Sequence, residues 1–277
     1  MNQILVPCDF SSPSIEGFKM AVDIASKSNG SITVLHAISL PSISDPVMSG
    51  DPIVYSQAFF SALEEDVKNS YAAMVQQYGK NAKVTLDIEG GSLFEVVKNI
   101  TEKRQVDLVV MGTTGTGTTR ALIGSNTEKA VRYSKVPVLA VRKACAITSI
   151  KNILLPATGD FNQTDFISKV KALQEFLKAQ LHILLINTPV NFRSDEEGKE
   201  TLEEFAKHYQ LENFVLHFKS YRNEEEGIID FSISNEMDLI VMATHSRRGL
   251  SHLLAGSITE DVVNHGLIPV WTYSIRK

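Results

Sequence analysis

The sequence predicts an α/β protein made of two tandem, doubly wound domains, each with a five-stranded parallel sheet and helices on both faces. Two observations support this prediction: apolar, strand-like runs alternate with helix-like segments, and the second half of the chain repeats the first. Alternation of this kind places a parallel sheet between two layers of helices, joined by right-handed crossovers. The length of 277 residues suits two domains, each large enough to bury a core.

The repeat is clearest near the end of each half. Residues 107–142 return as residues 238–274, with an offset of 131 between Asp107 and Asp238. The self-similarity at a fixed spacing indicates two copies of one folding unit. The predicted domains cover residues 1–143 and 150–277.

The openings of the two halves match at a different offset. Residues 4–7 correspond to residues 153–156 at an offset of 149, which exceeds 131 by 18. The first half therefore carries about 18 extra residues in its middle. We place them near residues 40–60, where prolines and a Ser-Gly-Asp-Pro turn interrupt any periodicity.

The elements of the first half each have a local signal. Residues 4–7 are a continuous apolar run, and Ser12 followed by Pro13 begins a helix with one apolar face. Ser92 and Glu95 form a capping box for a later helix. The predicted strands are residues 4–7, 32–38, 84–88, 107–112 and 137–142, and the predicted helices begin near residues 12, 60, 92 and 125.

The second half follows the same order. Its predicted strands are residues 153–156, 181–186, 214–218, 238–243 and 269–273, and its predicted helices include residues 166–177, 201–209 and 227–233. The last strands of the two halves, within residues 136–141 and 268–273, are short, apolar and at a sheet edge. Because an unpaired apolar edge favours association, we expect them to pair and make an intramolecular pseudo-dimer.

Composition excludes several classes of function. The net charge is −5 and no Lys/Arg-rich run occurs, so a nucleic-acid partner is not expected. No stretch approaches the roughly 18 apolar residues of a membrane span, and the first residues do not form a signal region, so we expect no membrane association and a cytoplasmic protein. Cys8 and Cys145 are expected to be passive thiols, and His36 to be structural.

Glycines cluster after the predicted strand at residues 107–112. Gly112 and Gly115 lie in the loop, and Gly124, Ser125 and Asn126 open the next helix. Glycines let backbone N–H groups approach a ligand closely, and a helix N-terminus adds unpaired donors and partial positive charge. The segment therefore suits an anion such as a phosphate.

A purely structural interpretation accounts for this loop equally well. The glycines can be turn residues, and Ser125 with Glu128 can be a capping box, which Ser257 and Glu260 repeat in the second half. Other motifs are absent from the sequence: it has no P-loop, no dinucleotide fingerprint after the first strand, no GxSxG and no HExxH. Hydrolytic machinery is therefore not evident.

Taken in order, several short motifs make the chain resemble the universal stress protein family. They are the opening strand with Pro-x-Asp-Phe-Ser, VLHA, DLVVMG, a Gly-x2-Gly loop with a later Gly-Ser, and VPVLAV. The resemblance covers nearly the whole chain as two tandem domains. It implies a Rossmann-like fold of the adenine nucleotide alpha hydrolase type and, in nucleotide-binding members, a Gly-x2-Gly-x9-Gly-Ser/Thr motif that holds ATP.

Carried over residue by residue, the resemblance implies a site in each domain. In the first domain, Gly112, Gly115, Gly124, Ser125 and Asn126 would hold the phosphates and ribose, and Pro7, Asp9 and Ala37 the adenine end. A weaker second site would comprise Pro156, Ala243, Ser246, Gly256 and Ser257. The implied ligand is ATP or ADP, with Mg²⁺ or Mn²⁺ on the phosphates rather than in a protein cage.

Departures from the family motif differ between the two domains. The first has eight residues instead of nine between Gly115 and Gly124. The second keeps nine, but has Ala243 and Ser246 in place of glycines and Thr158 in place of the aspartate. Because a loop can redistribute one residue, whereas a Cβ and a missing carboxylate remain, we expect the first domain to bind and the second to be degenerate.

Two functions from different classes follow. The first is a stress-response protein that binds adenine nucleotide through its first domain, with at most weak ATPase activity. The second is a nucleotide-free platform of the same fold for protein interactions. Single-domain members of the family are usually dimers through their last strands, which agrees with an intramolecular pseudo-dimer here. We further expect a homodimer of chains, which does not follow from that pairing. The sequence does not identify the protein partner.

Overall fold

The computed structural model describes residues 1–38, 57–113, 127, 129–131, 134–245, 258–259, 262–263 and 268–275, with the backbone alone at residues 57–60 and 245. The first half contains β1 (Gln3–Pro7), α1 (Ser12–Ser28), β2 (Ser31–Ile38), α2 (Gln57–Tyr78), β3 (Lys83–Gly90), α3 (Leu93–Lys103), β4 (Leu108–Gly112) and β5 (Val138–Val141). A short 3-10 turn, η2 (Ile147–Ser149), lies in the connection between the halves. The second half contains β6 (Asn152–Ala157), α5 (Thr164–Leu177), β7 (Gln180–Asn187), α6 (Asp195–His208), β8 (Phe214–Ser220), α7 (Glu224–Ser234), β9 (Leu239–His245) and β10 (Val270–Ile275).

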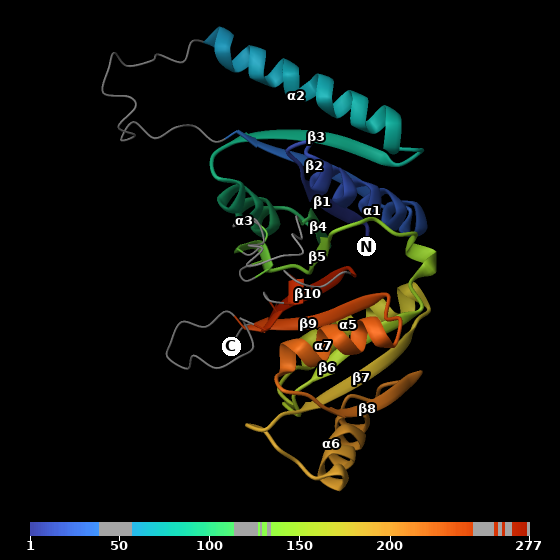
Figure 1. Cartoon of the computed structure of the whole chain (residues 1–277). Helices are drawn as coiled ribbons and strands as arrows, with labels where there is room; N and C mark the ends of the chain where they lie inside the picture. The colour runs from blue at the N-terminus through green and yellow to red at the C-terminus, as the bar shows by residue number, and fades with distance from the viewer. Residues whose placement is uncertain are drawn as a thin grey trace, which may run out of the picture.

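All ten strands form one continuous sheet in the order β3-β2-β1-β4-β5-β10-β9-β6-β7-β8 (Figure 1). Within each half the strands are parallel, which confirms two doubly wound domains of five strands. The halves meet where β5 pairs with β10 in antiparallel fashion. The predicted pairing of the two last strands is therefore confirmed.

The core lies on both faces of this sheet. Successive side chains of a strand point to opposite faces, so Ile4 and Val6 of β1 enter one apolar cluster and Leu5 enters another. The cluster with Ile4 also contains Leu139, Ile153 and Trp271, so it runs through both domains. On the opposite face one cluster lies in the first domain, and another lies mainly in the second domain and includes Ala140 of β5. Burial of apolar surface is thus shared across the junction, most extensively on the face with Ile4.

Helix α1 fastens the two domains together. The Asp23 carboxylate accepts a hydrogen bond from the Ile147 N–H of η2 at 2.5 Å, and Glu16 accepts one from the Ala144 N–H at 2.8 Å. The Lys27 ammonium lies 5.0 Å from the centre of the Phe176 ring of α5. These contacts fix the connection against the first domain.

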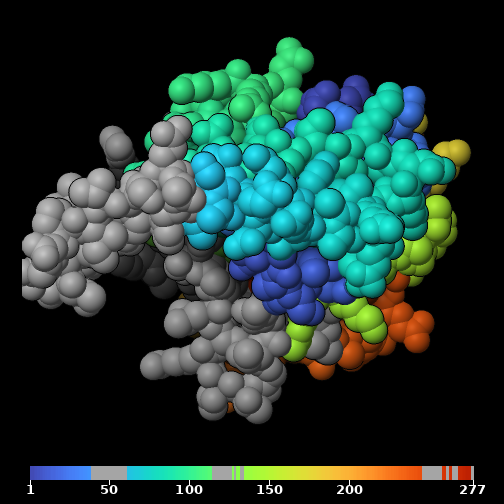
Figure 2. Space-filling view, turned by 90° about the horizontal axis from the view of Figure 1, so that it is seen from above, coloured from blue at the N-terminus to red at the C-terminus, as the bar shows by residue number. Residues whose placement is uncertain are grey.

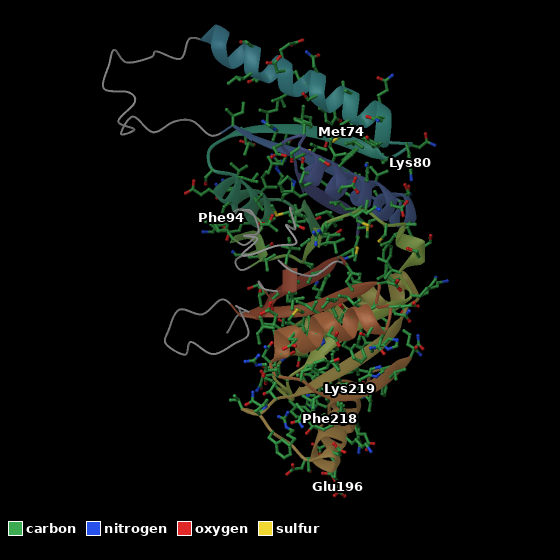
Figure 3. All side chains as sticks on the ribbon, in the orientation of Figure 1. Met74, Lys80, Phe94, Glu196, Phe218 and Lys219 are labelled. Carbon is green, nitrogen blue, oxygen red and sulfur yellow. The ribbon has the colours of Figure 1, made fainter. Side chains whose placement is uncertain are left out.

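The extra length of the first half is divided between a loop and a helix. Residues 39–56, where most of it was predicted, lie outside the described residues. Helix α2 is 22 residues long and α6 is 14, so part of the extra length lies in the helix itself. Figure 2 shows α2 across the end of the molecule beside β3, and Figure 3 shows Met74 on its side toward the sheet. Met74 is 4% exposed and accepts a hydrogen bond from the Cys8 thiol at 3.8 Å.

Several predicted helix ends differ from the structure, most clearly those of α1 and α6. The N-cap of α1 is Ser11 rather than Ser12, and α1 ends at Ser28, with Asn29 at a φ of 53° as its C-cap in place of Gly30. Helix α6 begins at Asp195 instead of residue 201, because Ser194 and Glu197 form a complete capping box that periodicity alone did not reveal. Ser92 accepts from the Glu95 N–H as predicted, although the Glu95 carboxylate bonds to the Ser92 hydroxyl.

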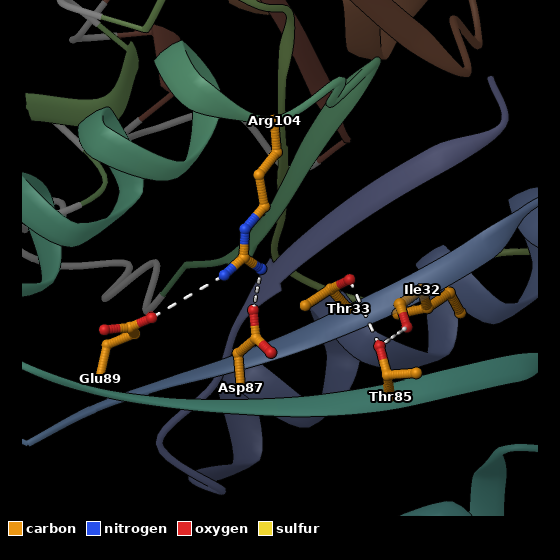
Figure 4. Close-up of polar contacts among 6 residues, drawn as sticks. All are labelled: Ile32, Thr33, Thr85, Asp87, Glu89 and Arg104. Carbon is orange, nitrogen blue, oxygen red and sulfur yellow. Dashed lines mark hydrogen bonds and ion pairs between the residues drawn. The ribbon is translucent and has the colours of Figure 1, made fainter.

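Polar side chains tie the outer strands of the first domain to α3. The Arg104 guanidinium, at the end of α3, hydrogen-bonds to Asp87 of β3 and lies 3.9 Å from Glu89 (Figure 4). Beside this pair, the Thr33 and Thr85 hydroxyls are 3.4 Å apart across β2 and β3. The contacts hold β3, the end strand of the sheet, against the helix layer.

Both cysteines are free thiols, as expected. Burial raises the pKa of the Cys8 thiol and that of the Cys145 thiol, so both remain protonated and are poor nucleophiles. Among the described residues, no helix combines the length and the apolar character that crossing a bilayer requires.

Candidate functional site

The carboxyl ends of β1, β2 and β4 bring together the predicted residues of the first domain. Strand β1 lies between β2 and β4 in the sheet. Pro7 ends β1, Ala37 lies near the end of β2 and Gly112 ends β4. Asp9 lies two residues beyond the end of β1. Ligands of open α/β sheets bind at this edge, so the topology assembles the predicted residues where a ligand site is expected.

Asp9 is an exposed carboxylate held in place by its own turn. Its Oδ1 accepts hydrogen bonds from the Ser11 N–H at 3.0 Å and from the Ser11 hydroxyl at 2.5 Å. Partial burial acts to raise the pKa of the Asp9 carboxyl, but hydrogen bonds from Ser11 and Ser14 outweigh it and hold the pKa below its ordinary value. Asp9 is therefore ionised near neutral pH and presents an oriented acceptor at the edge of the sheet.

Gly112 permits helix α1 to approach the end of β4 very closely. A Cβ on Gly112 would lie 1.8 Å from the Pro13 carbonyl oxygen, and a Cβ on Gly17 would lie 2.8 Å from the Gly112 nitrogen. The first turn of α1 thus rests directly on the end of β4. Gly112 is more than a turn residue, because its missing side chain sets the position of the helix N-terminus beside the loop.

The turn between β1 and α1 is braced by an aromatic pair. The ring of His36 lies 5.4 Å from that of Phe10, at 16°, and His36 Nδ1 lies 2.9 Å from the Cys8 carbonyl oxygen. Phe10 has a φ of 61°, a backbone conformation uncommon for a bulky residue. His36 therefore has the structural role that the sequence predicted, next to Ala37. The sequence carried no signal for the strained Phe10.

The remaining predicted residues of the first site follow β4 in the sequence. Gly115, Gly124, Ser125 and Asn126 fall outside the described residues. On either side of them, Thr113 follows β4 and donates its N–H to the Val141 carbonyl at 2.8 Å, and Thr127 is helical and buried.

The second domain has a longer turn after its first strand than the first domain. Pro156 and Ala243 lie at the carboxyl ends of β6 and β9, while Ser246, Gly256 and Ser257 lie outside the described residues. Six residues, 158–163, lie between β6 and α5, against four, 8–11, between β1 and α1, and Thr158 occupies the place expected for the aspartate.

A carboxylate that the sequence analysis missed lies in this turn. Asp160 Oδ1 accepts the Asn162 N–H at 2.9 Å, the same i to i+2 turn that Asp9 forms with Ser11. The expectation that the second domain lacks this carboxylate was therefore wrong in one respect: a carboxylate is present two residues beyond Thr158. The Asp-x-Asn pattern before a helix is the signal that would have revealed it.

The two domains carry different charge at their ligand edges. The first turn of α6 contains Asp195, Glu196 and Glu197, and the first turn of α7 contains residues 224–226, all glutamates. The corresponding first turns of α1 and α2, within the described part of the chain, contain no acidic residue, and that of α3 contains Glu95. The edge of the second domain is accordingly the less favourable of the two for an anionic ligand.

Two parallel, doubly wound α/β domains, joined edge to edge and each presenting the carboxyl ends of its strands, define a tandem Rossmann-like protein. The sequence model of the Universal stress protein family matches residues 1–142 and residues 149–274. The chain therefore belongs to the universal stress protein family and contains two copies of its domain.

Individual relatives agree with this assignment. A universal stress protein of Synechocystis is 23% identical over 99% of this chain and 100% of its own length. One from Methanocaldococcus jannaschii is 30% identical over 51% of this chain and 82% of its own length. The crystal structure of a universal stress protein from Archaeoglobus fulgidus covers 99% of this chain and 98% of its own, with a TM-score of 0.73 and 20% identity, and so has the same fold.

Proposed function

We propose that the first domain binds an adenine nucleotide, ATP or ADP, as part of a stress response. The adenine end would lie at Pro7, Asp9 and Ala37, and the phosphates and ribose would lie along Gly112, Gly115, Gly124, Ser125 and Asn126. A Mg²⁺ or Mn²⁺ ion would accompany the phosphates. The observation that carries the proposal is the convergence of an oriented, ionised Asp9 with the close approach of α1 to Gly112 at one edge of the sheet.

Each part of this arrangement suits one part of a nucleotide. An ionised carboxylate accepts hydrogen bonds from amino or hydroxyl groups, and such charge-assisted bonds are the stronger ones. Helix α1 begins at the same edge, and the side chain of its N-cap, Ser11, forms no capping hydrogen bond to the helix. The partial positive charge of a helix N-terminus favours anions such as phosphate.

The proposal places the working site in the first domain alone. In the second domain, Ala243 and Ser246 stand where the family motif has glycines. The acidic first turns of α6 and α7 add negative charge at the edge where phosphates would enter. Asp160 supplies a carboxylate close to Thr158, at the adenine end, but it changes neither of these two differences, so we expect one nucleotide per chain.

The matched carboxylates provide the test. Asp9→Asn keeps an oxygen for the Ser11 turn and removes the charge, and Asp160→Asn makes the same change in the second domain. Because a hydrogen bond to a charged group contributes about 1.5–3 kcal/mol, Asp9→Asn should weaken ATP binding roughly tenfold or more in calorimetric titration. Asp160→Asn should leave both affinity and stoichiometry unchanged.

Other results would contradict the proposal. Equal loss in both variants, or loss in Asp160→Asn alone, would place the working site elsewhere than in the first domain. Absence of heat with ATP or ADP in the wild-type chain, together with no nucleotide released from purified protein by acid, would favour the nucleotide-free platform.

A further inference from the structure

The loop between β7 and α6, residues 188–194, displays two apolar side chains to solvent. Val190 is 87% exposed and Phe192 is 77% exposed, the largest values for big apolar residues in the described part of the chain. Single exposed apolar residues are ordinary on a protein surface. Two large ones, two positions apart on one loop, form a small projecting surface that we call the apolar tip, made of Val190 and Phe192.

Hydrogen bonds hold the apolar tip in a fixed conformation. The Asn187 side chain, at the end of β7, forms two hydrogen bonds to the other end of the loop. Its Nδ2 donates to the Arg193 carbonyl at 3.1 Å, and its Oδ1 accepts the Arg193 N–H at 2.8 Å. Within the loop, the Asn191 N–H donates to the Thr188 carbonyl at 3.1 Å. A loop that is already ordered loses little conformational entropy when a partner binds it.

The loop is also tied to the neighbouring helix. Asn191 Nδ2 donates to Glu224 Oε1 of α7 at 3.2 Å, so the N-terminus of α7 lies against the apolar tip. Helix α6 begins directly after the loop, at Asp195. Both helices therefore start beside Val190 and Phe192.

These two helix starts surround the apolar tip with negative charge. Residues 188–197 and 221–226 contain six acidic residues and only two basic ones, Arg193 and Arg222. We call the six acidic residues the acidic rim: Asp195, Glu196, Glu197, Glu224, Glu225 and Glu226. Figure 3 shows Glu196 at the outer end of the molecule formed by α6.

The negative charge of the acidic rim favours some binding partners of the apolar tip over others. A second copy of the chain, docked tip to tip, would bring two acidic rims together. An anionic lipid surface or a nucleic acid would likewise be repelled. A positively charged protein segment would be attracted by the acidic rim and would cover the apolar tip with its own apolar side chains.

We infer that the apolar tip and acidic rim dock a basic segment of a partner protein that alternates Lys or Arg with large apolar side chains. This surface lies on the second domain and requires no nucleotide, so it is independent of the site proposed in the first domain. Electrostatic attraction would speed encounter, and burial of Val190 and Phe192 would slow dissociation.

The experiment uses the full chain and a labelled synthetic peptide of alternating lysine and leucine, with a glutamate–leucine peptide as the matched probe. The test variant is Val190→Ser with Phe192→Ser. The control is Ile233→Ser, because Ile233 is another exposed apolar residue, 51% exposed, on α7. Binding is measured by fluorescence anisotropy at two salt concentrations, and circular dichroism checks that each variant is folded.

We expect the lysine peptide to bind the wild-type chain and the Ile233→Ser control equally. Binding to the double variant should be about tenfold weaker or more, as for a central apolar contact. Added salt should weaken binding to the wild-type chain, and the glutamate peptide should not bind.

Several results would overturn the inference. No binding of the lysine peptide to the wild-type chain, equal binding to the double variant, or binding of the glutamate peptide would each do so. A wild-type dimer in sedimentation that becomes a monomer in the double variant would identify a second copy as the occupant. Tip-dependent binding to phosphatidylglycerol vesicles would identify a membrane.

Discussion

Leu139 of β5 lies opposite Trp271 of β10, and the two residues occupy the same position in their halves of the repeat. A pseudo-twofold axis therefore passes between them. A symmetric dimer would place identical side chains at this axis, whereas one chain can place a large ring against a smaller residue. Both are buried, and Trp271 packs with its ring 6.2 Å from that of Phe166. The core at the junction of the domains thus contains one large and one smaller side chain at equivalent positions, Trp271 and Leu139.

We expect Trp271→Ala to cost about 3–5 kcal/mol in free energy of unfolding, the usual range for removing a buried aromatic ring. Trp271→Phe should lower the free energy of unfolding clearly less. Nε1 of Trp271 has no hydrogen-bond partner among the described residues, so its removal leaves no other polar group unpaired. Urea denaturation followed by far-ultraviolet circular dichroism measures both, since Trp271 is the single tryptophan. An equal loss of free energy of unfolding in the two variants would indicate that the indole N–H forms a stabilising hydrogen bond.

Gly112 provides a second, local prediction. Gly112→Ala places a Cβ against the Pro13 carbonyl, which is backbone and cannot rotate away, so we expect a cost of roughly 1–3 kcal/mol or more. The reverse change in the second domain, Ala243→Gly, should cost about 1 kcal/mol or less, because it removes no clash and only loosens a strand. Thermal or urea denaturation of the two variants tests the difference. A harmless Gly112→Ala would show that α1 can move away from β4.

The histidine pair of the second domain makes stability depend on pH. His182 Nδ1 lies 3.0 Å from His217 Nε2 across β7 and β8. Burial lowers the pKa of His182; burial also lowers the pKa of His217, with His182 and Lys219 adding to the effect. The unfolded chain therefore binds protons more readily than the folded one. Stability from this source is fully present above the unfolded value of about 6.5 and is lost as the pH falls below it.

His182→Thr is the matched variant, because Thr33 occupies the corresponding position of the first domain. We expect the free energy of unfolding to fall less steeply between pH 7 and pH 5 in this variant than in the wild-type chain, as measured by urea denaturation at several pH values. An unchanged slope would mean that other groups dominate the acid sensitivity.

Much of the fold could be predicted from the sequence because its strands are short apolar runs that recur at a fixed offset. The repeated aspartates illustrate this: Asp107 accepts hydrogen bonds from the N–H groups of Asn2 and Gln3, and Asp238 from those of Lys151 and Asn152. The aspartate therefore accepts two backbone hydrogen bonds at the same place in both copies of the repeat. The pairing of β5 with β10 followed from the apolar character of two edge strands.

The candidate site was predicted less completely, for physical reasons. Asp160 was missed because residue counting assumed turns of equal length after β1 and β6. The importance of Gly112 depends on the approach of α1, a tertiary contact that no local pattern encodes. The φ of Phe10 is likewise set by its packing on His36 rather than by its own preference.

The last prediction concerns the effect of nucleotide binding in the first domain on the unfolding of the whole chain. Because one apolar cluster passes through both domains and β5 pairs with β10, we expect the domains to unfold in a single cooperative transition. Nucleotide bound to the first domain should then raise the Tm of the whole chain. A ligand that binds only the folded state contributes about 2.7 kcal/mol at a hundred times its Kd, so millimolar ATP with Mg²⁺ should shift the Tm by several degrees.

Calorimetric scans with and without Mg²⁺ and ATP test this expectation. Gly115→Val, in the first domain, should abolish the shift, and Gly256→Val, at the position of the second domain that corresponds to Gly124, should retain it. Two resolved transitions, of which ATP moves one, would show that the domains unfold separately despite the shared sheet. A shift lost in Gly256→Val and kept in Gly115→Val would move the nucleotide to the second domain, against the charge that α6 and α7 place there.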